Sequence, residues 1–299
     1  MRKKQFAKQI SEFRMFVELR KFRRNGAIRV IPLKTQKIRR SKMLAQNETV
    51  VKTTNKTVKS LAVVMPVYNE GEHIYANLLE ASRIVGSFAE DYEIVAVNDG
   101  STDNSLEEIR RAMKADDHIR VVYYDQNHGK GYAVKLGMMT SGKELTAFCD
   151  SDLELTPKML KSYARALRQS GADIVIGSKM HKNSRIEYPF LRKVMSYGYY
   201  IYLKALFRMN LKDTQTGIKL YKTSCIKDVL QHVDTEGFSF DIEVLAFAHS
   251  LGYRIIEMPV VLSFSRKAGN RSKIRPGTIF NMISDTLKIR RRVKEFKNK

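Results

Sequence analysis

The sequence predicts an α/β protein in which a mostly parallel sheet carries helices on both faces. Between residues 61 and 178, short apolar segments alternate with longer segments of helical character. The short segments are apolar almost throughout, as expected of strands buried on both faces of a parallel sheet. The chain has 299 residues, of which 43% are hydrophobic, and this is enough for one large domain with appended segments.

Five strands and four helices are expected in alternation. Pro66 ends the first strand, because proline cannot extend a ladder of hydrogen bonds. Asp103 is expected to cap the second helix, and Gly171 follows the last helix at the position where glycine commonly ends one. The strands are expected at 61–66, 92–99, 119–125, 145–150 and 172–178, and the helices at 72–85, 103–114, 131–139 and 157–171.

The net charge of +23 is concentrated in the two ends of the chain. Residues 1–60 contain 18 Lys and Arg against 3 Asp and Glu, and residues 264–299 contain 12 against 2. The middle of the chain contains 24 against 26 and is nearly neutral. We therefore expect a basic extension and linker at 1–59, a domain that holds the chemistry at 60–263, and a basic loop with a C-terminal amphipathic helix at 264–299.

Both basic ends interleave apolar side chains with Lys and Arg, as at Phe6, Phe13 and Phe16. This pattern is typical of helices that lie on an anionic membrane surface. The alternative is a helix that packs on the domain with its charges in water, and nucleic acid is not an expected partner. The longest apolar candidate, 194–207, is too short to span a bilayer. We expect a peripheral protein on the cytoplasmic face of a membrane, without a transmembrane helix.

Acidic residues follow the fourth expected strand at every second position. Asp150 and Asp152 share the period of two that points side chains the same way, and Glu154 extends this spacing. Carboxylates held together repel unless a cation lies between them, and their oxygen atoms suit Mg²⁺ or Mn²⁺. The alternative is an acidic start to the next helix. Polar segments also follow the first two strands, so we expect a site beyond the carboxyl ends of the sheet.

Five motifs in order carry a resemblance to a known family. They are "VVMPVYNEGEHI", "VAVNDGSTDNS", "NHGKGYAVKLGM", "DSDLELTP" and "DTQTGIKLY". Together the sequence resembles inverting family 2 glycosyltransferases of the GT-A fold, over roughly residues 60–290. Within that family it looks most like the synthases that transfer one sugar from a nucleotide-sugar to a polyprenyl or dolichyl phosphate.

The resemblance implies a role for each matching residue. It implies that Asp150, Asp152 and Glu154 are metal ligands, although mannosyl synthases often have Gln at the position of Glu154. It implies that catalysis rests on Asp150 and Asp152 together with Lys179 and Arg192. The implied nucleotide-sugar contacts are Pro66, Tyr68, Glu70, Asp99, Lys130, Asp150 and Gln215, and the implied contacts to the acceptor phosphate are Lys179, Arg192, Ser196, Arg271 and Lys273.

The segment "DTQTGIKLYK" resembles the glucosyl type more than the mannosyl type, so UDP-glucose is the first expected donor and GDP-mannose the second. The acceptor phosphate is already ionised near neutral pH, so inversion at the anomeric carbon needs no strong general base. In agreement with this, the six histidines are scattered along the sequence, and none is expected to act as a catalytic base. A saccharide or other acceptor, a mannosyl-type enzyme, and a binding module that has lost catalysis are the alternatives.

Overall fold

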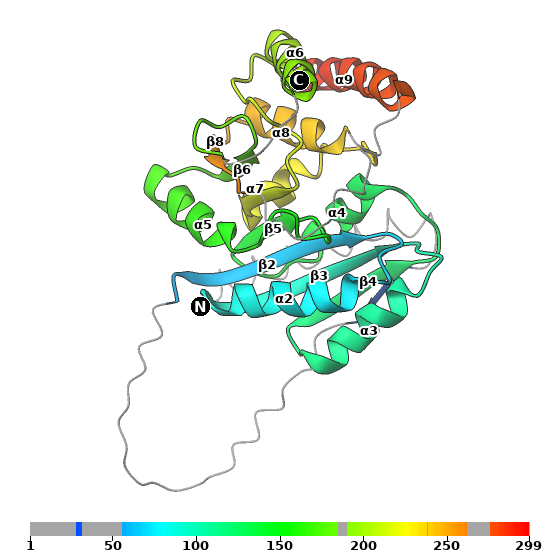
Figure 1. Cartoon of the computed structure of the whole chain (residues 1–299). Helices are drawn as coiled ribbons and strands as arrows, with labels where there is room; N and C mark the ends of the chain where they lie inside the picture. The colour runs from blue at the N-terminus through cyan, green and yellow to red at the C-terminus, as the bar shows by residue number, and fades with distance from the viewer. Residues whose placement is uncertain (1–27, 32–55, 185–189, 238, 262–275, 299) are drawn as a thin grey trace, which may run out of the picture.

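A computed structural model describes the chain except for residues 1–27, 32–55, 185–189, 238, 262–275 and 299. Its centre is an eight-stranded sheet in the order β1-β4-β3-β2-β5-β7-β6-β8 (Figure 1). The strands are β1 Arg29–Ile31, β2 Val58–Val67, β3 Ala89–Asp99, β4 Ile119–Tyr124, β5 Leu145–Cys149, β6 Ile174–Ser178, β7 Ile218–Lys222 and β8 Ile255–Pro259. The five expected strands are thus confirmed, with small shifts at their ends. The prediction that Pro66 ends the first strand is wrong, because β2 continues through Pro66 to Val67 in register with β3.

Most of the sheet is parallel, as predicted. Strands β4, β3, β2 and β5 run in the same direction, so their carboxyl ends meet at one edge. Strand β7, which the sequence did not predict, lies antiparallel between β5 and β6. Strand β1 pairs antiparallel with the outer edge of β4. The basic N-terminal segment therefore contributes a strand to the sheet instead of remaining wholly outside it.

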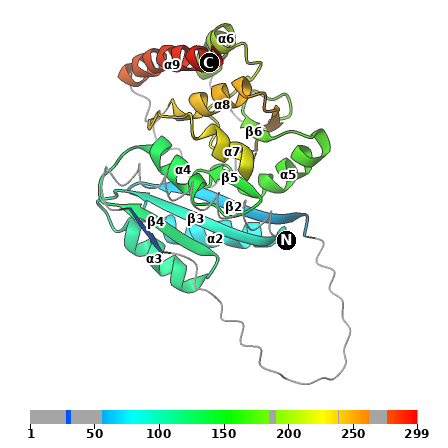
Figure 2. The same ribbon diagram turned by 180° about the vertical axis from the view of Figure 1, so that it is seen from behind.

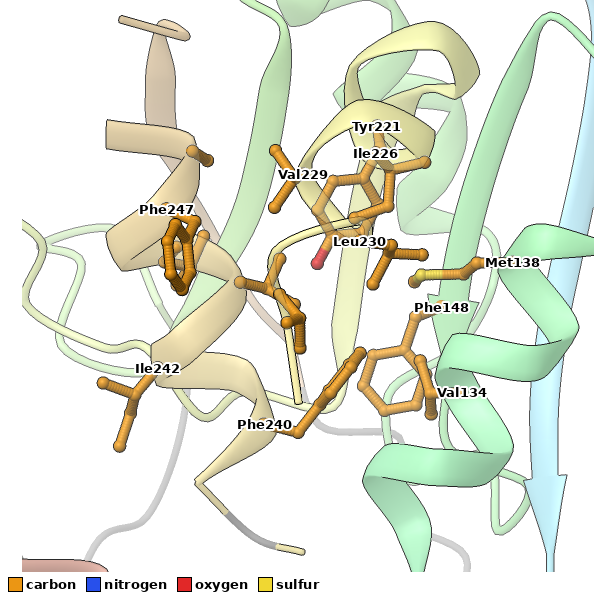
Figure 3. Packing of buried hydrophobic residues seen from close by; sticks show 14 of the residues in the cluster. Val134, Met138, Phe148, Tyr221, Ile226, Val229, Leu230, Phe240, Ile242 and Phe247 are labelled. Carbon is orange, nitrogen blue, oxygen red and sulfur yellow. The ribbon is translucent and has the colours of Figure 1, made fainter. Parts of the chain in front are cut away.

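Helices cover both faces of the sheet, as Figure 1 and the reverse view in Figure 2 show. One face buries apolar side chains of α2, α3 and α5, and the other buries those of α4, α7 and α8. Figure 3 shows this second cluster, where Phe240 of α8 lies beside Phe148 of β5 and Val134 of α4. The helices are α2 Ile74–Gly86, α3 Ser105–Ala115, α4 Lys130–Met139, α5 Met159–Ser170, α6 Phe190–Phe207, α7 Thr223–Val229, α8 Phe240–Ser250 and α9 Pro276–Lys297.

The start of α3 differs from the prediction. Asn104, not Asp103, stands at the N-cap position, and its side chain makes no capping bond. The Asp103 carboxylate instead accepts the backbone N–H groups of Ser105 at 2.9 Å and of Gly71 at 2.9 Å. One carboxylate therefore joins the start of α3 to the loop after β2, because a backbone N–H group from each segment donates to it.

Helices α6 and α9 lie side by side at the end of the molecule farthest from α2 and α3 (Figures 1 and 2). The Tyr199 hydroxyl lies 3.4 Å from the Thr286 hydroxyl, and the Tyr202 hydroxyl donates to the Ile283 carbonyl at 3.4 Å. Ile289 and Val293 of α9 are buried in the cluster that also contains α8. In the part of the chain that the structure describes, every helix is too short or too polar to cross a membrane.

Candidate active site

Asp150 follows β5 directly and is held against the start of β7. Its backbone N–H donates to the Gly217 carbonyl at 3.0 Å, which extends the antiparallel pairing of the two strands by one residue. A Cβ atom on Gly217 would lie far inside van der Waals contact of the Asp150 carboxylate. Glycine is therefore required here for a close approach of backbone to a site residue.

We expect Gly217→Ala to lower the rate of sugar transfer about 10- to 100-fold, because displacing a reacting group by about 1 Å has effects of this size. The added methyl group must push the Asp150 carboxylate aside. Steady-state kinetics would measure the effect. Gly142→Ala is the matched control, since a Cβ atom at Gly142 meets no atom within 4 Å. Equal rates for the two variants would contradict the assigned position of Asp150.

The turn after Asp150 has a fixed conformation. The Asp152 Oδ1 atom accepts the Glu154 backbone N–H at 3.0 Å, and Asn77 donates to the Ser151 carbonyl at 2.8 Å. Leu153 has a φ of 55°, a conformation that L residues adopt only when their surroundings enforce it. Glu154 is exposed, and no group of three His, Cys, Asp or Glu suited to a metal occurs among the described residues. The metal role predicted for Glu154 stays a prediction.

Two lysines and two aspartates gather around the Phe148 ring. The Lys130 Nζ atom lies 2.7 Å from Asp150 Oδ1 and 4.9 Å from the centre of that ring. On the other strand, the Lys219 Nζ atom lies 5.4 Å from the same centre and 2.8 Å from Asp241 Oδ1. Burial opposes the charged form of Lys130, but Asp150, Asp241 and Asp152 raise the pKa of its ammonium above the usual value. Lys130 is therefore a cation paired with Asp150 and influenced by the charge of Asp152, which are two of the three predicted metal ligands.

Asp99 organises the loop that leads into α4. Its carboxylate is buried, with the residue only 3% exposed, and accepts the backbone N–H groups of His128 at 2.8 Å and Gly129 at 3.0 Å. It also accepts the Tyr124 hydroxyl at 2.8 Å, and burial together with this carboxylate raises the pKa of Tyr124 far above its ordinary value. These bonds fix the position of Lys130, the first residue of α4. Direct contact of Asp99 with a nucleoside stays a prediction.

The loop after β2 reaches the same edge of the sheet. Pro66 lies in β2, and the Tyr68 side chain is exposed. Asn69 has a φ of 53°, and the backbone N–H of Glu70 donates to the Ser105 hydroxyl at 2.8 Å. An exposed aromatic ring on a loop held by hydrogen bonds is suited to stack on a base. The predicted nucleoside contacts of Pro66, Tyr68 and Glu70 stay a prediction.

The predicted acceptor residues are only partly within the described structure. Lys179 follows β6, and its backbone N–H donates to the Asp213 carboxylate at 2.8 Å. The same carboxylate accepts the Gln215 N–H at 3.2 Å, so Lys179 and Gln215 share one anchor. Arg192 and Ser196 lie in the first half of α6, but their side chains are outside the described part of the chain, as are Arg271 and Lys273. Their roles stay predictions.

A family model described as "Glycosyl transferase family 2" matches residues 62–230, which is more than half of the chain. The chain belongs to glycosyl transferase family 2. The family resemblance and the glycosyltransferase class predicted from the motifs are thus confirmed. The match spans all of the strand ends described above, from the loop after β2 to β7.

Relatives with assigned activities are similar over most of this glycosyltransferase. A dolichyl-phosphate beta-glucosyltransferase of Saccharomyces cerevisiae is 29% identical, over 67% of this chain and 66% of its own length. One of Trichomonas vaginalis is 30% identical, over 77% of this chain and 72% of its own. The chain therefore spans about two thirds of the length of the yeast relative.

Solved structures show the same fold. Glucosyl-3-phosphoglycerate synthase of Mycobacterium tuberculosis, in complex with uridine diphosphate, superposes with a TM-score of 0.59. The alignment covers 83% of this chain and 86% of that one at 18% sequence identity. At this identity the likeness establishes the fold alone. The predicted α/β architecture of the GT-A type is thereby confirmed.

Proposed function

We propose that this family 2 glycosyltransferase moves glucose from a nucleotide-sugar, with UDP-glucose as donor, to dolichyl phosphate or a similar polyprenyl phosphate. The relatives at 28–30% identity that carry the name dolichyl-phosphate beta-glucosyltransferase support this acceptor and sugar. The single structural observation that carries the proposal is the group of Lys130, Asp150 and Asp152 at the carboxyl end of β5. With a divalent cation bound to the two carboxylates, such a group suits the diphosphate of a donor.

The charges of the site suit a divalent ion. Lys130 and Lys219 carry positive charges, whereas Asp150, Asp152 and Asp241 carry negative ones, so these five groups sum to about −1 when all are ionised. Asp150 and Asp152 would hold Mg²⁺ or Mn²⁺, which, when bound, neutralises charge on the leaving diphosphate. A structure of the Mycobacterium tuberculosis synthase in complex with Mn²⁺ and uridine diphosphate has the same fold.

The residues of this chain act mainly by positioning and charge. Lys130 orients the Asp150 carboxylate and adds a positive charge beside the diphosphate. Lys179 and Arg192 would hold the acceptor phosphate on the opposite side of the anomeric carbon. The acceptor oxygen then attacks as the diphosphate leaves, which inverts the configuration. Because a phosphate monoester is already ionised near neutral pH, holding it in line is the main requirement.

The acceptor carries its lipid chain in a bilayer, and the α6–α9 pair would bring the site to that surface. Tyr197 and Ile201 of α6 and Ile283 and Leu287 of α9 are exposed, each pair with the spacing of one helix face. On α9, exposed Arg290 and Lys294 continue the face that carries the two apolar residues. Apolar side chains flanked by cations suit the interface of an anionic membrane.

We expect Ile283→Ser combined with Leu287→Ser to weaken binding to vesicles at least about tenfold. Moving each of these exposed aliphatic side chains from water into the membrane interface contributes up to about 1.5–3 kcal/mol to the free energy of binding. Flotation with vesicles of phosphatidylcholine and phosphatidylserine would measure this. Val30→Ser, at an exposed position of β1, is the control. Unchanged flotation of the double variant would argue against docking through α9.

The test of the function is a donor screen with the full chain. Purified protein would be incubated with dolichyl phosphate, Mn²⁺ or Mg²⁺, and labelled UDP-glucose, GDP-mannose, UDP-galactose or UDP-GlcNAc in parallel. We expect label in the organic phase with UDP-glucose alone. Label from GDP-mannose alone would show that the transferred sugar is mannose and not glucose. Nucleotide-sugar hydrolysis without organic-phase label from any donor would overturn the lipid phosphate as acceptor.

A further inference from the structure

The loop between α7 and α8 lies between the C-terminal helix and the donor site. On one side it meets the first turn of α4: the Tyr132 backbone N–H donates to the Glu236 carbonyl at 3.1 Å. A Cβ atom on Gly131 would lie 2.7 Å from the same carbonyl oxygen. Farther along α4, the Lys135 ammonium donates to the Val233 carbonyl at 2.5 Å. The first turn of α4, which carries Lys130, therefore rests directly on this loop.

On its other side the loop is held by a buried carboxylate. Glu243 of α8 is fully buried, and its Oε2 atom accepts the backbone N–H groups of Asp234 at 3.0 Å and Thr235 at 2.7 Å. Its other oxygen accepts a hydrogen bond from Arg292 of α9. Every oxygen of this carboxylate thus has a donor, and two of the three donors belong to the loop.

Arg292 completes the attachment. Its guanidinium also donates to the His232 carbonyl at 2.8 Å and lies 2.6 Å from the Asp234 carboxylate. One side chain of α9 therefore binds the loop at two residues and the helix after it at a third. The planar guanidinium, with donors in fixed directions, is suited to hold three groups at once.

We propose that Arg292 and Glu243 are positioning residues for the donor site, through which α9 sets the place of the first turn of α4 and of Lys130. The path runs from Arg292 to the loop at 232–236, then to Tyr132 and Gly131, and then to the Lys130–Asp150 ion pair. This inference rests on the proposed nucleotide-sugar function. It extends that function by making the C-terminal helix, the same helix proposed to dock on the membrane, part of the donor site's support.

The test measures binding of UDP with Mn²⁺ to the full chain by calorimetry. We expect Arg292→Gln to raise the Kd for UDP about tenfold, within the range found when a residue that orients a binding group is removed. Glu243→Gln should act in the same direction. The Kd for UDP of Arg292→Lys should lie between those of the unmodified chain and Arg292→Gln, because lysine keeps the positive charge but lacks the several fixed donors of the guanidinium. In the transfer assay the donor KM should rise, whereas the KM for dolichyl phosphate should not change.

Arg291→Gln is the matched control, because Arg291 neighbours Arg292 but its side chain is 83% exposed and, among the described residues, pairs with Glu295 at 2.9 Å on the surface. Its Kd for UDP should equal that of the unmodified chain. An Arg292→Gln protein that melts earlier but binds UDP with unchanged Kd, measured well below its melting temperature, would overturn the inference. If the unmodified chain bound no UDP, the proposed function would fail first and the inference with it.

Discussion

Replacing Asp152 by asparagine should lower sugar transfer about 10²- to 10³-fold, the range found when one preorganised electrostatic contact to a transition state is removed. The chain should fold as before. The only intramolecular hydrogen bond described for the Asp152 carboxylate comes from the Glu154 backbone N–H. An asparagine Oδ1 atom can accept the same bond, so the turn that contains Leu153 should keep its conformation.

A substitution at Asp152 tests the effect of the negative charge with less disturbance of the structure than a substitution at Asp150. Asp150 forms the ion pair with Lys130, and its substitution would also release that ammonium. Removing the charge of Asp152 instead leaves the Lys130–Asp150 contact in place and makes the group of five charges neutral. The variant should therefore bind UDP with Mn²⁺ more weakly while its melting temperature stays close to that of the unmodified chain.

The measurement is the transfer rate as a function of Mn²⁺ concentration, with calorimetric UDP binding as a second readout. Asp91→Asn serves as the control, because Asp91 lies at the opposite end of β3 and pairs with Lys143 on the surface. A full transfer rate for Asp152→Asn at low Mn²⁺ would show that this carboxylate is no metal ligand.

The alternating part of the fold could be predicted from the sequence, because strands buried on both faces are apolar throughout and helices are marked by their periodicity. Strand β7 could not, since Lys219 and Lys222 interrupt its apolar pattern and its direction depends on its neighbours. Strand β1 has only three residues, inside a strongly basic segment, and its pairing with β4 gives no local signal.

The same distinction holds for the site. Asp150, Asp152 and Lys130 could be predicted because each lies in a motif next to the end of a strand or the start of a helix. The pairing of Lys219 with Asp241 spans 22 residues of sequence, and that of Glu243 with Arg292 spans 49. Both pairings arise from packing between distant elements. The local sign of the Lys219–Asp241 pairing was the position of Lys219 between apolar residues, because a buried ammonium requires a partner.

Replacing Lys219 by methionine should lower the free energy of unfolding by about 3–5 kcal/mol, the usual cost of removing one partner from a buried ion pair. Lys219 is fully buried, and its ammonium donates to the Thr216 carbonyl at 2.7 Å and to Asp241 at 2.8 Å. The Asp241 side chain is only 15% exposed, so without Lys219 its largely buried charge would lose its hydrogen-bonded partner.

Lys222→Met is the matched control for this loss of stability. Lys222 lies on the same strand and pairs with Asp173 at 2.8 Å, but its side chain is 41% exposed. Because water already solvates that pair, its loss should cost about 1 kcal/mol or less. Urea unfolding of both variants, followed by circular dichroism, would compare the two costs directly.

A double variant, Lys219→Met with Asp241→Leu, tests the cause of the loss. If the cost of Lys219→Met comes from the unpaired Asp241 charge, removing that charge should restore most of the stability, because apolar replacement of a whole buried pair is often close to neutral. If the double variant is no more stable than Lys219→Met, the loss comes instead from the Thr216 carbonyl and the packing of Lys219 on Phe148. Equal stability of Lys219→Met and the unmodified chain would contradict the burial of this pair.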